Sequence, residues 1–588
     1  MSAMDRIVPR YAVEGSTSPL ATGTARTRAR RRHPFASPEL IMRIPLRKHA
    51  ALTTAATATA VLLAACASGS PENASRKPPS DAPIASFTYA ATQWPTSLNG
   101  RTTKIATAQI STLVTQPLER FSYADGQVRF APNLAVSVRQ TDPQTVVYTL
   151  REGVKFSDGT PLSPADAVWS ITAAAAPTAE TAAVMQGFAS AVSSGAHELT
   201  VKWQWPIGLP GLREKIAGTV EIQQAKFAQS HPDDLGTPSA LPIGTGPYRY
   251  QSQTAQDIKL VPNDQYWGEK PKVQNLTFTR FTQDASAQLA MRSGSVQAAQ
   301  PIDVKTAPQW EKIEGSSLYA AHDPSTSFLS MDLNTPPFDD VHVRKAIAYA
   351  LDRESIAQAA FGGRADLLKG LLPAAGFTGA APSLTAAQQF LDQLPSTGFD
   401  LGKAKAELAQ SSRPHGFATT MTYSSGATWQ QILLLSLQEN LKQLGITLEL
   451  KPVSAQEWFQ TFFSHRATGI QVFPDIAILS GEVTAPLPGI VGKASMRPQM
   501  LNSANFTSPA IESAYPMIDA KTAGAYPKDR QWEATKTVLT EVANQVPYVP
   551  LFSQHNVYVA GKGFVFTTTP SFFDLLSGSW IDYVRATR

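Results

Sequence analysis

The sequence contains almost no cysteine: Cys66 is the only one in 588 residues. A single thiol excludes an intramolecular disulfide framework and any paired Cys-x-x-Cys motif of a redox or zinc site. Long apolar stretches are equally scarce. The one extended run, Ala50–Ala65, has about 16 residues where roughly 20 are needed to span a bilayer. We therefore expect the chain after Cys66 to be stabilised by buried apolar surface, without disulfides.

An excess of basic charge is confined to the first 65 residues. The whole chain has a net charge of +5, but residues 1–65 carry ten of the 51 Lys and Arg and three of the 46 Asp and Glu. The remainder has 41 basic and 43 acidic residues. A protein that binds nucleic acid through its phosphates needs a basic surface. The charge therefore gives no support for a nucleic-acid-binding protein.

Catalytic and metal-binding motifs are missing as well. None of the nine histidines stands in H-x-H or H-E-x-x-H, and there is no G-x-S-x-G. The segment Gly244–Tyr248 lacks the spacing of a phosphate-binding loop and predicts a turn. His322, His342, His465 and His555 leave metal or haem binding open, but surface or hydrogen-bonded core positions are the simpler interpretation. We therefore predict no catalytic residue, no metal site and no cofactor.

The lone cysteine ends a segment that resembles a bacterial lipoprotein signal. Three basic residues between positions 43 and 48 precede the apolar run, as in a secretory signal peptide. Leu62–Cys66 resembles the lipobox, in which a peptidase cuts before the cysteine and the cysteine is then acylated. Two or three acyl chains hold a protein on a membrane far better than one. We expect residues 42–65 to be the signal peptide and Cys66 to carry the lipid, on the extracytoplasmic face of the cell membrane; a plain membrane anchor or a buried core cysteine is the alternative.

Two further segments near the start of the chain lack a core-forming pattern. Residues 1–41 show no apolar periodicity, and we expect a non-structural extension; a twin-arginine export signal around Arg31-Arg32 is the alternative. Residues 66–84 are rich in Pro and Ser and bury too little apolar surface to become ordered. We expect them to form a disordered tether, which would reach up to roughly 50 Å if extended.

The roughly 500 residues that follow exceed one hydrophobic core, so two or more lobes are expected. Ser86–Ala90 and Thr145–Leu150 have strand patterns. Ser163 followed by Pro164 is typical of a helix start. A single helix is predicted over Val341–Phe361, with Asp339 and Asp340 as its cap. We expect the basic side chains of that helix (Arg344, Lys345 and Arg353) to face solvent or to form local pairs.

A series of motifs resembles family 5 of the bacterial extracellular solute-binding proteins, the dipeptide-, oligopeptide- and nickel-type receptors of ABC importers. The motifs occur in family order over about residues 85–565. They include Arg151–Leu162, Pro242–Tyr248, Asn263–Pro271, Asp284–Leu289, Met331–Asn334, Pro337–Arg353, Leu441–Ile446 and Pro547–Leu551.

The resemblance implies an α/β fold: a two-lobed, periplasmic-binding-protein-like (type II) clamshell with an extra subdomain in lobe one. Lobe one is expected to comprise residues 81–335 and 545–588, with the inserted subdomain at about 113–245, and lobe two residues 336–544. A solute in the cleft favours hinge closure, and an ABC permease with its ATPase recognises the closed state. We expect a monomer that binds its ligand and is not an enzyme.

The segment that holds the peptide ammonium in this family departs from the family pattern here. Relatives carry G-W-x-x-D-Y-P-D-P, and the matching segment is 475–488. In it Gly481 replaces the tryptophan and Thr484 replaces the aspartate. Glu482 lies two positions earlier and is the only nearby carboxylate. A buried ammonium without a counter-charge costs several kcal/mol, so either Glu482 takes the role of the aspartate or the ligand has no free ammonium.

We predict a ligand site made of one loop segment and two aromatic walls. The predicted residues are Ser480, Gly481, Glu482 and Thr484, with Trp94 and Phe328 as apolar walls; for the two aromatics, ordinary core packing is the alternative.

A peptide is the default ligand of the family. A metal chelate, haem or another small organic solute is the alternative, and a lipid-tethered structural or adhesion protein is a second class of function.

The anchor hypothesis gives a first testable prediction. Replacing the only thiol, Cys66→Ser, removes the acylation site and should move the protein from the membrane fraction to the soluble extract. Fractionation of cells that express both forms checks this. Retention of the variant in the membrane fraction would refute the anchor.

Overall fold

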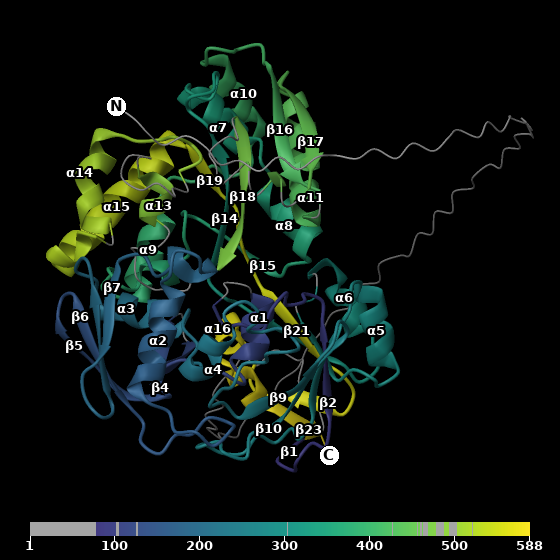
Figure 1. Ribbon diagram of the computed structural model, residues 1–588. Helices are drawn as coiled ribbons and strands as arrows, with labels where there is room; N and C mark the ends of the chain where they lie inside the picture. Colours follow the sequence, from purple (N-terminus) through teal and green to yellow (C-terminus); the bar gives the residue numbers. More distant parts are fainter. Residues whose placement is uncertain are drawn as a thin grey trace, which may run out of the picture. The chain divides into compact units, whose positions relative to one another are not determined.

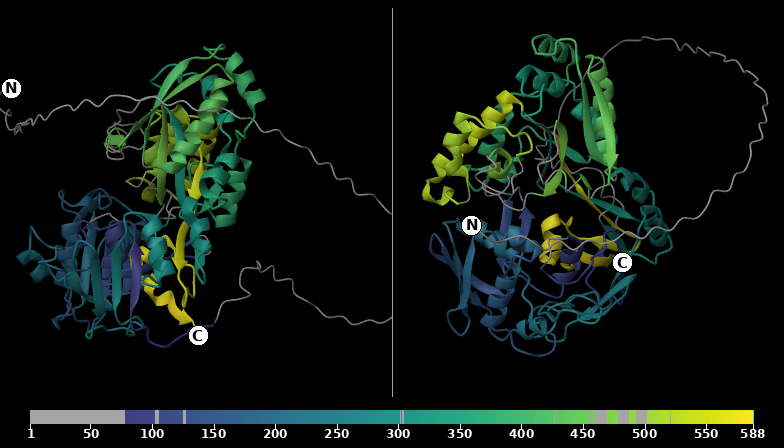
Figure 2. Two further views of the ribbon diagram at one scale, coloured as in Figure 1. Left: turned by 90° about the vertical axis from the view of Figure 1, so that its right-hand side faces the viewer. Right: turned by 45° about the horizontal axis from the view of Figure 1, so that its top comes forward.

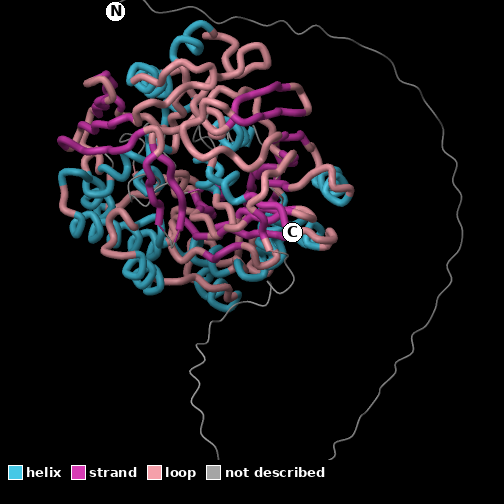
Figure 3. The backbone as a smooth tube through the Cα atoms, turned by 90° about the horizontal axis from the view of Figure 1, so that it is seen from below, coloured by secondary structure: helices cyan, strands magenta, loops and turns pink. Residues whose placement is uncertain are grey.

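The computed structural model describes residues 78–587, except for a set of short gaps (Figure 1). The gaps are 102–104, 125–126, 301, 303, 426, 455–456, 459–460, 462–468, 478–486, 493–501 and 520. The predicted signal peptide and Cys66 lie outside the described residues. Helices and strands are interspersed along the described chain (Figure 3), which confirms the predicted α/β class. Across these residues, no helix combines the length and apolar character of a membrane span.

A seven-stranded mixed sheet brings together segments that lie far apart in the sequence. Its strands, in spatial order, are β13 (Ser317–Ala321), β21 (Asn556–Ala560), β12 (Ala298–Gln300), β2 (Phe87–Ala91), β11 (Leu276–Arg280), β10 (Asp257–Pro262) and β9 (Tyr248–Gln253). Strand β2, predicted one residue earlier, is parallel to β11 and to β12, and the outer pairs are antiparallel. Tyr89 of β2 packs against Phe278 and Trp580 in the core of this sheet.

A four-stranded antiparallel sheet is formed by residues 135–203. Its strands, in spatial order, are β5 (Ala135–Asp142), β6 (Thr145–Leu150), β8 (Glu198–Trp203) and β7 (Phe188–Ser193). Strand β6 has the predicted bounds. Helix α2 (Pro164–Ala174) begins after Ser163, whose backbone N–H donates to Asp166 Oδ2 at 3.0 Å in a capping box. The predicted helix start is therefore confirmed.

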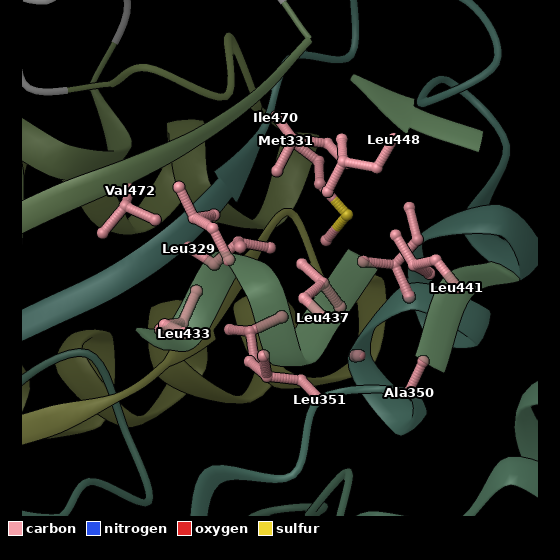
Figure 4. Packing of buried hydrophobic residues seen from close by; sticks show 14 of the residues in the cluster. Leu329, Met331, Ala350, Leu351, Leu433, Leu437, Leu441, Leu448, Ile470 and Val472 are labelled. Carbon is pink, nitrogen blue, oxygen red and sulfur yellow. The ribbon is translucent and has the colours of Figure 1, made fainter. Parts of the chain in front are cut away.

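A second group of sheets is formed by residues 325–554. It contains the three-stranded sheet β18 (Ile470–Ala477), β14 (Ser325–Met331) and β19 (Tyr548–Pro550), the parallel pair β16 (Ala418–Ser424) and β17 (Thr447–Val453), and the pair β15 (Ala365–Leu367) and β20 (Phe552–Gln554). Residues four apart lie on the same face of a helix, so the leucines of helix α11 (Thr428–Lys442) form one apolar stripe. This stripe packs against the strands of the second group. Figure 4 shows that stripe with its strand partners: Leu433, Leu437 and Leu441 with Leu329, Met331, Ile470 and Val472.

The remaining elements surround these sheets. The strands are β1 (Pro79–Ser80), β3 (Glu119–Ala124), β4 (Gln127–Pro132), β22 (Phe564–Phe566) and β23 (Val584–Thr587). The helices are α1 (Ile105–Ser111), α3 (Leu209–Ala217), α4 (Ala225–Ser230), α5 (Asp284–Arg292), α6 (Ala307–Glu311), α9 (Leu384–Gln393), α10 (Leu401–Ala409), α13 (Leu487–Val491), α14 (Pro509–Ile518), α15 (Lys528–Gln545) and α16 (Phe572–Ser577). Helices α14 and α15 lie side by side (Figure 2).

The described residues begin inside the segment predicted as a tether. Strand β1 pairs with β23, and Asp81 forms ion pairs with Lys272 at 2.8 Å and with Arg585 at 2.9 Å. The pairing supplies backbone hydrogen bonds that composition alone does not reveal. For Pro79–Asp81, which belong to the predicted tether 66–84, the prediction of disorder is therefore wrong, and residues 66–77 lie outside the described residues.

The predicted single helix Val341–Phe361 is wrong, because two helices occupy this stretch. Helix α7 (Val341–Tyr349) is capped by Asp340, which accepts a hydrogen bond from the backbone N–H of His342 at 2.8 Å. Helix α8 (Arg353–Phe361) has its own cap, Asp352, which accepts from Ser355 N–H at 3.0 Å. The second aspartate satisfies an orphan amide and starts a new helix where a continuous one was predicted.

The prediction of solvent-facing cations is also wrong for Arg344 and Arg353. The side chain of Arg344 is buried, and its guanidinium donates to the carbonyls of Phe338, Asp339 and Gln545 at 2.8–3.0 Å. Arg353 donates to the carbonyls of Leu368 and Pro550. Burial lowers the pKa of Arg344 to about 10, so it stays charged at neutral pH. Both arginines join segments distant in sequence by satisfying backbone carbonyls.

Glu221 is a titratable group set into a small apolar hollow of about 130 Å³. Ser111 Oγ donates to its carboxyl at 2.7 Å, and Thr115 Oγ1 is its second donor. Burial raises the pKa of Glu221 to about 7, and the two hydroxyl donors only partly offset this. Between about pH 4.3, the pKa of an unfolded Glu, and about pH 7, the folded state therefore keeps a proton on Glu221 that the unfolded state releases.

Arg344→Met should destabilise the fold by about 2–4 kcal/mol, because three carbonyls, of which that of Phe338 is buried, lose their charged donor. Urea unfolding followed by circular dichroism measures the change. Lys345→Met, on the adjacent and less buried position of the same helix, is the matched control and should shift stability by less than about 0.5 kcal/mol. Equal losses for the two variants would contradict the bridging role of Arg344.

Glu221→Gln should remove a pH dependence of stability. Between the unfolded pKa of Glu, about 4.3, and the folded value, the folded state holds the extra proton, so the free energy of unfolding falls as pH rises. The variant should gain on the order of 2–3 kcal/mol over the natural chain at pH 8 relative to pH 5. Unfolding curves at the two pH values test this, with the exposed Glu314→Gln as control; parallel pH profiles for Glu221→Gln and the natural chain would rule the effect out.

Candidate functional site

The predicted ligand segment lies between two fixed elements. Ser480, Gly481, Glu482 and Thr484 all fall in residues 478–486, outside the described residues. Strand β18 ends at Ala477, and helix α13 begins at Leu487. The first three residues of the matching segment 475–488 form the end of β18. The structure thus places the two ends of the segment, at Ala477 of β18 and at Leu487 of α13.

The upstream end is held by a buried strand. Every residue of β14 is buried, and β14 pairs antiparallel with β18 on one side and with β19 on the other. In this register Ala477 lies opposite Ser325, the first residue of β14. The predicted ligand segment therefore leaves the sheet beside the point at which the chain enters β14.

The downstream end is held by Tyr548 of β19. Its hydroxyl lies 2.8 Å from the carbonyl oxygen of Ile490 in α13 and 2.7 Å from Asn502 Oδ1. Asn502 in turn donates to the carbonyl of Gly492. Burial raises the pKa of Tyr548 well above its usual range, so the phenol stays protonated and can donate. The same tyrosine thus supports the stretch on either side of residues 493–501.

Phe328 lies in the core of this region. Its side chain has no exposed surface, stacks on Phe473 with ring centroids 4.3 Å apart, and meets Tyr548 edge to face at 5.1 Å. This arrangement corresponds to the core-packing alternative. In this conformation Phe328 offers no surface to a ligand and instead supports the two strands that flank the segment.

Trp94 lies at a different edge, beyond the end of β2. Because β2, β11 and β12 are parallel, their carboxyl ends, which include Ala91 and Gln300, meet at one edge of the seven-stranded sheet. Ligands of open α/β sheets bind outside such carboxyl ends. Trp94 is partly exposed there and packs against the core below it. Its position is compatible with a ligand wall.

Gln300 is a polar residue at the same edge that the sequence did not reveal. It is buried, and its Oε1 atom has no hydrogen-bond partner among the described residues. An unpartnered buried amide oxygen is costly unless a donor reaches it. A glutamine in the segment Ala298-Ala299-Gln300 carries no motif, so only the sheet topology indicates it.

The described histidines occupy different settings. His342 Nδ1 lies 2.7 Å from Glu407 Oε2, so these two side chains form a pair. His465 lies outside the described residues. His322 and His555 come together with Asp366 in a group whose ligand atoms all lie within 4.8 Å of one another. The sequence left metal binding by His322 and His555 open, but it did not indicate that the two histidines meet at Asp366.

Comparisons with known proteins agree with this architecture. Residues 129–473 match the sequence profile of bacterial extracellular solute-binding proteins, family 5. The glutathione-binding protein GsiB of Salmonella typhi is 24% identical over 444 residues, which cover 74% of this chain and 83% of GsiB. The alignment therefore extends over most of the length of this relative.

Two solved structures share the fold. DppA of Helicobacter pylori, an ABC transporter-associated periplasmic binding protein in complex with the peptide STSA, superposes with a TM-score of 0.66 at 17% identity, covering 86% of this chain and 99% of DppA. AgaA of A. tumefaciens R10, in complex with agropinic acid, superposes with a TM-score of 0.66 at 20% identity, covering 86% of this chain and 99% of AgaA. These likenesses confirm the predicted two-lobed periplasmic-binding-protein fold.

The family profile spans more than half of the chain, and it includes β14 and the first residues of β18. The family resemblance carried by the sequence motifs is therefore confirmed. This chain belongs to family 5 of the bacterial extracellular solute-binding proteins.

Proposed function

We propose that this chain is the substrate-binding subunit of an ABC importer, which captures a peptide or glutathione-type solute between its lobes and delivers it to the permease and ATPase. The family match over residues 129–473 carries the proposal. The relative GsiB and the structural neighbour DppA, which bind glutathione and the peptide STSA, support this class of ligand. The protein acts outside the cytoplasm, held at the membrane by lipid on Cys66. Its role is binding, without turnover of the solute.

The arrangement of the sheets supports a hinge between two lobes. Lobe one contains the seven-stranded sheet, and lobe two contains the sheets of β14 to β20. The chain crosses between them after β13, at residues 322–324, and again between β20 and β21, at His555. Because β14 and β20 pair with strands of the second group, these crossings are favoured over the boundaries near 335 and 545 that the sequence predicts. Rotation about two short connections is the geometry of hinge closure.

The ligand is held, in this proposal, by the segment after β18. Ser480, Gly481 and Thr484 present backbone and hydroxyl groups, and Glu482 supplies the counter-charge for an ammonium. An extended peptide can add its backbone to an exposed strand or loop edge, as in other β-augmentation modes. Trp94, at the carboxyl edge of the parallel strands, forms an apolar wall on the lobe-one side. Gln300, with its unpartnered Oε1, is an additional acceptor at that edge.

A non-peptide solute is the second candidate. Thr484 replaces the family aspartate that pairs with the peptide ammonium, and AgaA shares the fold in complex with agropinic acid. A metal chelate, haem or another small organic solute belongs to the same candidate class. A tethered structural protein without a solute is a further alternative, and it differs because no small ligand would stabilise it.

Thermal unfolding with a ligand panel distinguishes these functions. A ligand that binds only the folded state at 100 times its Kd stabilises that state by about 2.7 kcal/mol. Short peptides, glutathione, nickel chelates, haem and sugars form the panel. A shift with peptides or glutathione supports the first candidate and a shift with another compound the second. The absence of any shift favours the structural protein.

The role of Glu482 is tested by Glu482→Gln. With a peptide that shifts the melting temperature, the variant should bind at least roughly tenfold more weakly, because a desolvated ammonium loses its counter-charge. Titration calorimetry measures the affinity. The exposed Glu457→Gln, upstream of β18, is the matched control and should bind as the natural chain does. Unchanged affinity in Glu482→Gln would exclude Glu482 as the ammonium partner.

A further inference from the structure

Three side chains from distant parts of the sequence converge near the two chain crossings. His322 Nδ1 and His555 Nε2 each lie 3.1 Å from the same carboxylate oxygen, Oδ2 of Asp366. The two imidazole rings have centroids 3.7 Å apart. Each residue offers one ligand atom, and the three atoms all lie within 4.8 Å of one another.

Backbone pairing holds the three residues in place. Asp366, the middle residue of β15, lies opposite Ser553 of β20, and the N–H of His555 donates to the carbonyl of Arg364 at 3.1 Å. Ser553 also ties the crossing that contains His322, because its hydroxyl lies 3.1 Å from the carbonyl of Asp323 and accepts from Ser325 N–H at 3.0 Å. The group is therefore preorganised by the fold, which a binding site requires.

One of the three residues is buried with an unsatisfied nitrogen. The side chain of His555 is 7% exposed, and its Nε2 makes no hydrogen bond within the described residues, although Asp366 Oδ2 is in range. A buried polar nitrogen without a partner costs free energy. An ion placed between the nitrogen and the carboxylate would satisfy both groups.

The other two residues leave the group open to solvent. The side chains of His322 and Asp366 are 65% and 56% exposed. An ion can therefore enter, and water can complete its coordination.

Two charged residues close to the group in the described part of the chain, Arg364 and Asp323, have partners of their own. The nearby guanidinium of Arg364 pairs with Glu311. Asp323, next to His322 in sequence, is a buried carboxyl that accepts hydrogen bonds from Phe572 N–H and Asn556 Nδ2. The nearby cation is thus already paired, and a second carboxyl lies close to the group.

The donor set and the spacing fit a transition metal. Bonds of about 2.0–2.1 Å to nitrogen and oxygen in a tetrahedral site place neighbouring ligand atoms about 3.3 Å apart. The two nitrogen-to-oxygen separations here are 3.1 Å. Imidazole suits zinc, copper and nickel, whereas calcium and magnesium prefer sites made of oxygen alone.

We propose that His322, Asp366 and His555 bind one divalent transition-metal ion of the zinc or nickel class at the crossings between the sheets. The fourth position of a tetrahedral ion is open to water. The site differs from the predicted solute site after β18, shares no residue with it and does not depend on what that site binds. Occupancy joins β15 to both crossings, so the ion stabilises the folded state by binding it selectively.

Metal titration of the untagged, full-length protein tests the proposal. After chelator treatment and dialysis, calorimetry with Zn²⁺ and with Ni²⁺ should show one ion per chain, and either ion should raise the melting temperature. His555→Ala and Asp366→Asn should each weaken binding at least roughly tenfold and abolish the thermal shift, because losing a direct ligand costs more than losing the outer contacts whose mutation costs 10–100-fold. His342→Ala, which removes a histidine paired with Glu407 elsewhere, is the matched control and should leave both readouts unchanged.

A second variant keeps the proposal testable if His555→Ala does not fold. His322→Gln changes an exposed side chain and should also lose binding; with Co²⁺ as probe, it should lose the visible absorption bands of a tetrahedral site. The proposal is overturned if the natural chain binds no stoichiometric ion. It is equally overturned if the folded His322→Gln and Asp366→Asn variants bind as tightly as the natural chain, since the group would then be only a histidine–carboxylate ion pair.

Discussion

The pairing of β14 with β18 and β19 is the interaction on which the second group of sheets depends. It joins residues 325–331 to residues 470–477 and to residues 548–550, so a strand in mid-chain is placed between two later ones. All seven residues of β14 are buried, and its side chains serve two apolar clusters: Leu329 and Met331 in one, Phe328 in the other. A strand buried in this way tolerates little change, because packing is dense on both faces.

This constraint also organises the proposed solute site. The segment after Ala477 leaves the sheet beside the start of β14, and Tyr548 of the third strand supports helix α13, with which the described chain resumes. A binding loop supported at both ends by a rigid sheet can vary its residues without loss of the fold. The proposed replacement of the family aspartate by Thr484 would be such a variation. It separates the question of which solute binds from the question of which fold the chain adopts.

The crossings give the same sheets a second chemical feature. The chain passes from β13 to β14 through His322 and from β20 to β21 through His555, so both histidines lie where the two groups of sheets are joined. Strand β15, which carries Asp366, pairs with β20 close to one crossing. The meeting of the two histidines with Asp366 at the crossings follows from strand order, and no short sequence motif encodes it.

Local patterns in the sequence by themselves determined the α/β class, the family and several elements with correct bounds. Thr145–Leu150 and the helix start at Ser163-Pro164 depend on β-branched residues and on a capping side chain, which act over a few positions. The family motifs are likewise local, and the profile match over 129–473 agrees with them. Only the tertiary structure decided what depends on contacts between distant segments: the break between α7 and α8, the buried bridges of Arg344 and Arg353, and the meeting of His322, Asp366 and His555. The physical reason is that a charged side chain looks alike in sequence whether it faces water or a distant carbonyl, and only the packed backbone determines which partner it meets.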